Sequence, residues 1–319
     1  MRLKTMLEVA RTLGIPVPFS TGSLSSLVQV HGSEPFTYQN FLAKFDTLRM
    51  FYRSPEVILR ITREAVEDAA RDNVRYLELR FAPVALSFAE RFPLGDVMDW
   101  VCESAGKAMQ EFGILVKLIA SVNRHESVEL AEQVTLLAAD RTGRGMVGMD
   151  LAGNEAKFPA GPFLGVFKEA HQAGLKLTIH AGEWAGAVNV REALEMLQAD
   201  RIGHGVRVLE DPAVVEMAHN RGTPFEVCVT SNYQTGSVSS LPQHPLMRML
   251  QQGLNVTLGT DDPSISQITL TDEYRLVCED LGMEQKTLKE RIMAAAQASF
   301  LPDAEREELT HQLRTELGI

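Results

Sequence analysis

Residues 176–183 read KLTIHAGE, and residues 201–205 read RIGHG. Each stretch is a short apolar run that carries a histidine near its end, and a helical pattern of apolar residues over 190–198 separates the two. Near-continuous apolar runs are typical of parallel strands, because such strands are buried on both faces. The order strand, helix, strand therefore predicts a right-handed βαβ unit in a parallel sheet.

The same alternation extends along the chain in both directions. It predicts an α/β fold with seven visible strands, with the other five strands near residues 75–83, 114–122, 146–153, 225–232 and 255–263. Further helices are expected near residues 54–69, 126–139, 161–173 and 211–220. An open doubly wound sheet can hold seven strands, but a chain of 319 residues favours an eight-stranded (β/α) barrel. In a barrel, strand 1 would be missing, before the helix that begins near Met1.

We expect a single domain over residues 1–319, because no linker or repeat interrupts the pattern. A helical, aromatic-rich segment at about 36–53 lies before the first visible strand, at 75–83. It is either a lid over a site or a small packing helix. The tail is expected to be helical from about residue 270, without a further strand.

The composition excludes several classes of partner. The formal net charge of −11 argues against nucleic-acid backbones and anionic membrane surfaces, and it favours a small neutral or cationic substrate. No apolar run approaches the roughly 20 residues of a membrane span, and no secretion signal is recognisable, so a cytoplasmic location is expected. The three cysteines are odd in number and far apart, which predicts free thiols and no CxxC zinc site.

Polar residues collect at the predicted carboxyl ends of the strands, where parallel α/β folds bind their ligands. They are Asp150, Gly153, His180, Glu183, His204, Ser231, Asn232, Asp261 and Asp262. His180 could bind a metal while Glu183, three residues later, moves a proton without coordinating it. For either residue alone a structural role would be the better interpretation, but together they favour chemistry.

Two other positions in this set have plain alternatives. His204 lies between two glycines, which would let a ligand approach the backbone and leave the ring exposed, but a histidine in a tight turn is also possible. Asp261 and Asp262 would point to opposite sides if extended, one toward a cation and the other toward substrate. A charge-pair loop without function is the alternative. The remaining histidines, His125 and His244 among them, are weaker candidates.

Five motifs in this order, DLAGNE, TIHAGE, RIGHG, TSNYQTG and GTDDP, resemble the adenosine deaminase family of metal-dependent purine aminohydrolases. The resemblance runs from Met1 to about Leu281. It implies a (β/α)8 TIM barrel of the metal-dependent hydrolase type and one zinc ion, with zinc-dependent hydrolysis of adenosine or 2′-deoxyadenosine to the corresponding inosine and ammonia. The implied partner is thus a small purine nucleoside.

The resemblance also implies a role for each matching residue. His180 and Asp261 would be zinc ligands, and Glu183 would protonate the purine at N1. His204 would orient the attacking water and help to deprotonate it. Asp262 would bind N7, and Gly153 would bind N3 through its backbone. The segment around Phe41 and Phe45 resembles the family's apolar lid.

One feature of the family pattern is absent. The family has an HxH pair at the end of a strand before the helix that MRLKTMLEVA matches, and this sequence contains no HxH. Two of four protein ligands to zinc are therefore missing, which predicts an N-terminally shortened deaminase with exposed sheet edges, weak zinc binding and little activity. Alternatives are a deaminase of adenine or another 6-aminopurine derivative, and a catalytically dead purine-binding relative.

Overall fold

A computed structural model describes all residues 1–319 and contains one parallel sheet. The strands follow one another in chain order, each beside the next, as the alternation predicts. They are β1 (Tyr76–Phe81), β2 (Leu115–Asn123), β3 (Met146–Ala152), β4 (Lys176–Ala181), β5 (Arg201–His204), β6 (Pro224–Val227) and β7 (Asn255–Leu258). The prediction of seven parallel strands is confirmed.

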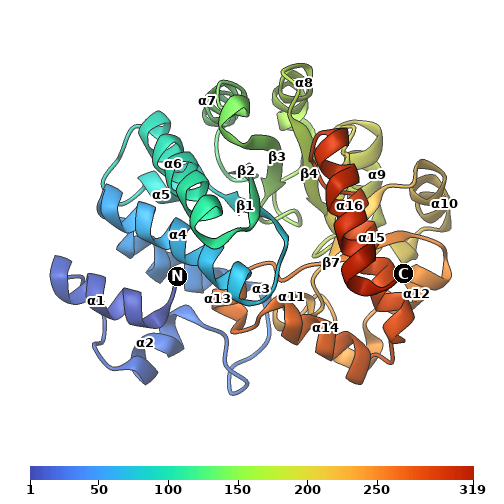
Figure 1. Cartoon of the computed structure of the whole chain (residues 1–319), viewed down its shortest axis with the longest axis horizontal. Helices are drawn as coiled ribbons and strands as arrows, with labels where there is room; N and C mark the ends of the chain where they lie inside the picture. Colours follow the sequence, from blue (N-terminus) through green and yellow to red (C-terminus); the bar gives the residue numbers. More distant parts are fainter.

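The sheet curls, and the helices lie around its outer side (Figure 1). Strands β1 and β7 do not pair with each other, so the sheet is a half-barrel and not a closed ring. The helices after the first three strands are α5 (Pro83–Ser87), α6 (Leu94–Phe112), α7 (Val128–Ala139), η2 (Thr142–Arg144), η3 (Gly161–Phe163) and α8 (Leu164–Gln172). Those after β4 to β6 are α9 (Ala187–Glu195), η4 (Val208–Glu210), α10 (Pro212–Arg221), α11 (Val229–Gln234), η5 (Leu241–Gln243) and α12 (Leu246–Gln251).

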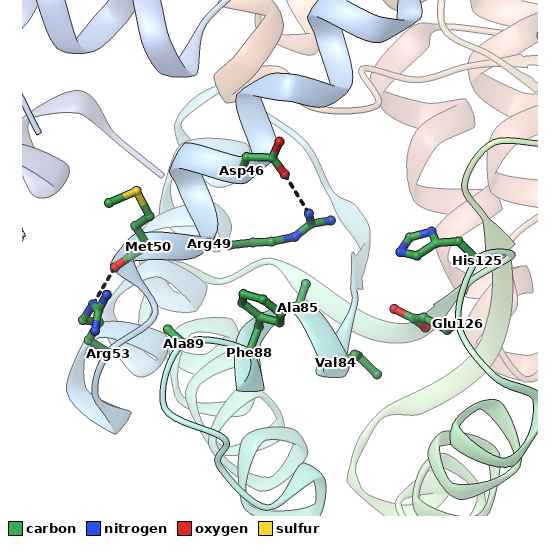
Figure 2. Close-up of a pocket in the computed structure, with 10 residues that line it drawn as sticks. All are labelled: Asp46, Arg49, Met50, Arg53, Val84, Ala85, Phe88, Ala89, His125 and Glu126. Carbon is green, nitrogen blue, oxygen red and sulfur yellow. Dashed lines mark hydrogen bonds and ion pairs between the residues drawn. The ribbon is translucent and has the colours of Figure 1, made fainter. Parts of the chain in front are cut away.

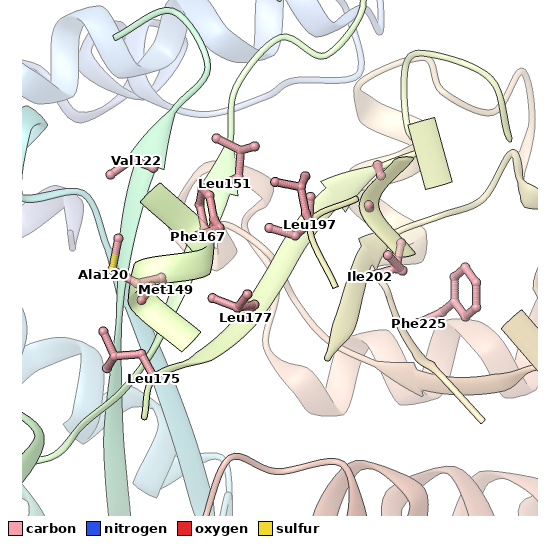
Figure 3. Packing of buried hydrophobic residues seen from close by; sticks show 14 of the residues in the cluster. Ala120, Val122, Met149, Leu151, Phe167, Leu175, Leu177, Leu197, Ile202 and Phe225 are labelled. Atoms are coloured by element: carbon pink, nitrogen blue, oxygen red, sulfur yellow. The ribbon is translucent and has the colours of Figure 1, made fainter. Parts of the chain in front are cut away.

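The main hydrophobic core lies between the sheet and these outer helices. Figure 3 shows Phe167 of α8 beside Met149 and Leu151 of β3, and all three side chains are fully buried. Neighbouring strands add Leu177 and Ile202 to the same cluster. Burying an aliphatic side chain of this size contributes roughly 1.5–3 kcal/mol to folding, so this layer holds the strand ends in place.

A second, smaller core forms beneath the first helices of the chain. It joins α1 (Leu3–Leu13), α2 (Thr21–Val28), α3 (Tyr38–Leu48), η1 (Arg49–Phe51) and α4 (Pro55–Arg71). Helix α4 begins as the sequence predicts, because the Ser54 hydroxyl accepts the N–H of Val57 and Pro55 occupies the first turn. Phe41 of α3 is buried in this core.

The C-terminal part is helical, with α13 (Pro263–Ser266), α14 (Leu270–Glu279), α15 (Gln285–Gln297) and α16 (Asp303–Leu317). Between the last two helices, Phe300 stacks under the guanidinium of Arg201 at 3.5 Å, and its N–H donates to Glu78. Arg201 of β5 also pairs with Glu78 of β1 and Glu226 of β6. These contacts link β1 to the far half of the curled sheet.

Two predicted strands, 225–232 and 255–263, extend well beyond the ends of the observed strands at Val227 and Leu258. The prediction for 225–232 fails after Val227, because the chain turns into α11 and places Ser231 and Asn232 on a helix. Strand β7 ends at Leu258, and Asp261 has a left-handed backbone with φ of 55°. The argument that Asp261 and Asp262 diverge as extended residues is therefore wrong. None of the helices is both long and apolar enough to cross a bilayer.

Candidate active site

Three side chains from the carboxyl ends of the strands meet at one point. They are His180 on β4, His204 at the end of β5 and Asp261 after β7, and one ligand atom of each lies within 4.8 Å of the others. The two imidazole rings are 5.1 Å apart, measured between centroids. The parallel order of β4 and β5 places them side by side, as the sequence predicts.

Asp150 of β3 orients the His180 ring. Its carboxylate lies 2.8 Å from Nδ1 of His180 and accepts the Ser121 hydroxyl at 2.7 Å. Burial alone would raise the pKa of Asp150, but His180 and Arg80 outweigh it and hold the pKa at about 2. An ionised carboxylate only accepts, so Nδ1 carries the hydrogen and Nε2 keeps its lone pair for a metal.

Glycine at position 203 lets the two strands approach this closely. A Cβ atom there would lie 3.2 Å from the His180 ring, tighter than ordinary contacts. The RIGHG motif therefore supplies both a glycine that packing requires, Gly203, and a candidate catalytic residue, His204.

His204 is buried, contrary to the expectation that the flanking glycines would expose it. Its backbone is left-handed, with φ of 60°, and its Nε2 lies 3.6 Å from Glu183 Oε2 and 4.0 Å from Asp261 Oδ2. Burial lowers the pKa of His204 to about 4, so the ring is neutral at pH 7. Strained backbone at a non-glycine residue is often found at functional sites.

Asp261 and Asp262 have different environments. Asp261 accepts the Ser231 hydroxyl at 2.7 Å and the Arg80 guanidinium at 3.0 Å. Burial, opposed by nearby His204 and Arg80, leaves the pKa of Asp261 below its ordinary value. Burial and the adjacent Asp261 charge raise the pKa of Asp262 to about 7. The pair therefore offers one charged carboxylate and one that can carry a proton near neutrality.

Glu183 is a buried carboxyl whose pKa is raised well above the ordinary value. Burial is the largest cause, and the charges of Asp261 and Glu155 add to it. A raised pKa favours the protonated carboxyl, which is the form that can donate a proton as a general acid must. The hydroxyl of Thr235 lies 3.3 Å from Oε1.

Glu155 holds the loop that carries Glu183, and we did not single it out from the sequence. One of its oxygens accepts the N–H groups of Glu183 at 2.6 Å and Trp184 at 2.7 Å, and the other accepts that of Gly182 at 2.9 Å. Asn189 donates to the same carboxylate at 2.9 Å. The only signal in the sequence was the acid that ends DLAGNE.

Arg80 is a second residue that the sequence did not point out. It lies on β1, beside the unpaired edge of the sheet, and reaches Asp261 and Asp150 at 3.0 and 3.6 Å. Its only sign in the sequence was a charged residue near the end of a predicted strand that also carries Glu78. Gly153, predicted from the sequence, follows β3 and adopts a left-handed φ of 92° that favours glycine.

A separate cavity of about 540 Å³ lies beside α3, η1 and α5 (Figure 2). His125, Arg49 and Phe88 face it, and none of the predicted catalytic residues lines it. His125, one of the weaker candidates from the sequence, thus lines this cavity and not the His180 cluster. The buried groups with perturbed pKa values meet instead at the His180 cluster, which makes that cluster the candidate active site.

The cluster fits a zinc ion. Zinc is bound by imidazole nitrogen and carboxylate oxygen, and His180 and Asp261 supply one of each. The hydrogen bond from His180 to Asp150 is the outer contact that orients zinc-binding histidines in proteins.

Comparison with known proteins identifies the family of this chain. The profile of the family described as adenosine deaminase matches residues 1–316. An adenosine deaminase of Klebsiella pneumoniae is 34% identical over 98% of this chain and 94% of its own length. Among solved structures, an adenine deaminase from Arthrobacter aurescens matches with a TM-score of 0.90, 26% identity, and coverage of 100% of this chain and 95% of its own. The N6-methyl-AMP deaminase of Arabidopsis thaliana gives a TM-score of 0.85 at 28% identity, over 100% of this chain and 92% of its own. The chain belongs to the adenosine deaminase family of hydrolytic deaminases.

Proposed function

We propose that this protein is a zinc-dependent hydrolase that converts adenosine and 2′-deoxyadenosine to the corresponding inosine and ammonia. The observation that carries the proposal is that His204 lies beside both Glu183, a buried carboxyl with a raised pKa, and Asp261. Hydrolysis of a C–N bond in an amidine-like ring needs a proton donor to the ring and a positioned oxygen nucleophile.

His180, through Nε2, and Asp261 would hold the zinc ion. When bound, the ion lowers the pKa of a water molecule to about 7, which supplies the nucleophile at neutral pH. Asp150 and Ser231 keep the two ligands in place, since each makes a 2.7–2.8 Å hydrogen bond to one of them.

Glu183 would protonate N1 of the purine, which makes C6 more electrophilic. Its raised pKa favours the protonated form that this role needs. His204 would orient the attacking oxygen from the other side of the cluster. Asp262 would contact N7, for which a carboxyl with a pKa of about 7 can donate its hydrogen, and the Gly153 N–H would donate to N3.

The chain would act as one barrel-type domain, and α3 would cover the site as a lid. Tyr38 at the start of α3 stacks on Trp184, with centroids 5.0 Å apart, and Trp184 directly follows Glu183. Phe36 contacts Tyr233 of α11 edge-on at 5.0 Å. These contacts support the lid, since they join the segment to both loops of the site.

A second candidate is deamination of another 6-aminopurine, either adenine or an adenine nucleotide. It is favoured by the two structural relatives described above, whose names give adenine and N6-methyl-AMP as substrates. The chemistry at C6 would be the same, and only the pocket for the rest of the molecule would differ.

The test is turnover of adenosine, 2′-deoxyadenosine, adenine and AMP by the purified chain, followed by ultraviolet absorbance, with bound zinc measured on the same sample. Adenosine turned over with the highest kcat/KM would support the main proposal. Preference for adenine or AMP would support the second candidate. Purine binding without turnover of any of the four would favour a catalytically dead relative.

A further inference from the structure

His244 is a buried histidine that the proposed chemistry does not use. It lies between η5 and α12, far from any strand end in sequence, and both of its ring nitrogens have partners. Nδ1 lies 3.1 Å from the backbone nitrogen of Leu246, and Nε2 lies 3.3 Å from Oδ1 of Asn232. Asn232 in turn lies 3.1 Å from Nδ1 of His204 through its Nδ2 atom.

The direction of this chain of hydrogen bonds is set by the backbone. Leu246 is the first residue of α12, so its N–H has no carbonyl partner within the helix. A backbone N–H can only donate, and Nδ1 of His244 must therefore accept. In the neutral ring the hydrogen then sits on Nε2.

The hydrogen on Nε2 of His244 determines how Asn232 is oriented. It requires an acceptor, which is the carbonyl oxygen of the Asn232 side chain. The amide nitrogen, which only donates, must then face His204. Nδ1 of His204 thus accepts, and its hydrogen lies on Nε2, the atom that faces Glu183 and Asp261.

We propose that His244 is a positioning residue that, through Asn232, holds His204 in the Nε2–H tautomer. His204 then donates a hydrogen bond into the site and acts neither as a ligand through Nε2 nor as an acceptor of a water proton there. His180 has the opposite tautomer, because Asp150 accepts from its Nδ1. At the site, Nε2 of His180 thus presents a lone pair, and Nε2 of His204 presents a hydrogen.

The inference deepens the proposed function, because it specifies how His204 would orient the attacking oxygen. It removes the second role that the family resemblance implies for this residue, help in deprotonation. The tautomer itself does not depend on which purine is the substrate, so it can be tested in a chain that turns over none.

The experiment is two-bond ¹H–¹⁵N correlation NMR of the ¹⁵N-labelled chain at neutral pH, without metal and then with Zn²⁺. The His204 signals are assigned from their loss in H204Q. We expect Nε2 protonated and Nδ1 unprotonated without metal, and the same pattern with Zn²⁺, while the His180 signals shift. Protonated Nδ1 in the metal-free chain, or loss of the Nε2 hydrogen with Zn²⁺, would overturn the proposal.

Variants test the link to His244. In H244F the ring can no longer donate to Asn232, so the amide is free to turn and signals of His204 with a protonated Nδ1 should appear. In N232D the carboxylate only accepts, and Nδ1 of His204 should carry a hydrogen in most molecules. H219F is the matched control, because His219 is exposed on α10 and its ring has a hydrogen-bond partner only in the carbonyl of Gly253. A His204 pattern unchanged in both H244F and N232D would show that His244 has no such role.

Turnover gives a separate readout if the chain deaminates adenosine. H244F should then lower kcat by at least several-fold and leave KM nearly unchanged, because the hydrogen bond from His204 serves the reacting oxygen and not the purine. If H244F lowers kcat and raises KM by similar factors while the His204 tautomer is unchanged, His244 has a structural role only. Absence of turnover in the unaltered chain would count against the proposed function and not against the tautomer.

Discussion

The carboxylate of Asp150 lies 2.8 Å from Nδ1 of His180, and this contact leaves Nε2 of the ring available to a metal. The two residues come from β3 and β4, whose paired register places their carboxyl ends together. Asp150 was noted in the sequence only as one of several polar strand ends. It places a supporting carboxylate behind His180, one of the residues that would hold the metal.

Replacement of Asp150 should weaken zinc binding. In D150A the His180 ring loses its acceptor and both its tautomer and its orientation become free, so we expect the affinity for Zn²⁺ to fall roughly 10- to 100-fold. Competition with a chromogenic chelator measures this. S121A is the control, because it removes only the hydroxyl that donates to Asp150. Equal zinc affinity in D150A and the unaltered chain would contradict this assignment.

Replacement of Glu183 should remove the proton donor and leave the metal site intact. E183Q is expected to lower kcat for adenosine by roughly 10²–10⁴-fold with the same zinc content, as for other general acids. E216Q, on the exposed side of α10, should have unchanged kcat. Since the protonated carboxyl is the active form, kcat of the unaltered enzyme should also fall as pH rises through the raised pKa of Glu183. A fully active E183Q would exclude this role.

Glu155 should matter for both stability and turnover. E155A leaves the N–H groups of residues 182–185 without their acceptor, and we expect roughly 2–5 kcal/mol less free energy of unfolding, measured in urea. Because the loop carries Glu183, E155A should also lower kcat, and by a larger factor than it lowers the amount of bound zinc. N189A removes one donor to the same carboxylate and should have a much smaller effect. Similar losses in the two variants would mean that the loop is held by other contacts.

The two buried histidines predict an acid-sensitive fold. Burial lowers the pKa of both His204 and His244 from 6.5 to about 4, so the unfolded chain binds protons at a higher pH than the folded one. The free energy of unfolding should therefore fall as pH decreases from about 6.5 to about 4, by roughly 3 kcal/mol for each ring. Urea unfolding at several pH values measures the slope.

The matched pair H244F and H219F isolates the part due to His244. H244F should have a shallower dependence on pH over this interval, because one of the two buried rings is gone. H219F should keep the slope of the unaltered chain, since His219 is exposed. A slope that is the same in all three proteins would mean that His244 titrates alike in the folded and unfolded chain.

The alternation of strands and helices and the main candidate residues of the site could be predicted from the sequence. Continuous apolar runs identify strands buried on both faces, and side chains at their carboxyl ends must meet at one edge of a parallel sheet. That rule alone placed His180, Glu183, His204 and Asp261 together. It works because it depends on local pattern and on the direction of the chain.

The groups that support those residues could not be predicted in this way, because they are brought to the site by long-range contacts. Arg80, Glu155 and His244 act across 181, 28 and 12 residues of sequence, respectively, on Asp261, Glu183 and Asn232, and no local pattern specifies such distances. Burial, which the sequence did not predict for His204, determines its charge state. The hydrogen-bond direction through Asn232 follows from the start of α12, since an unpaired backbone donor exists only once that helix is formed.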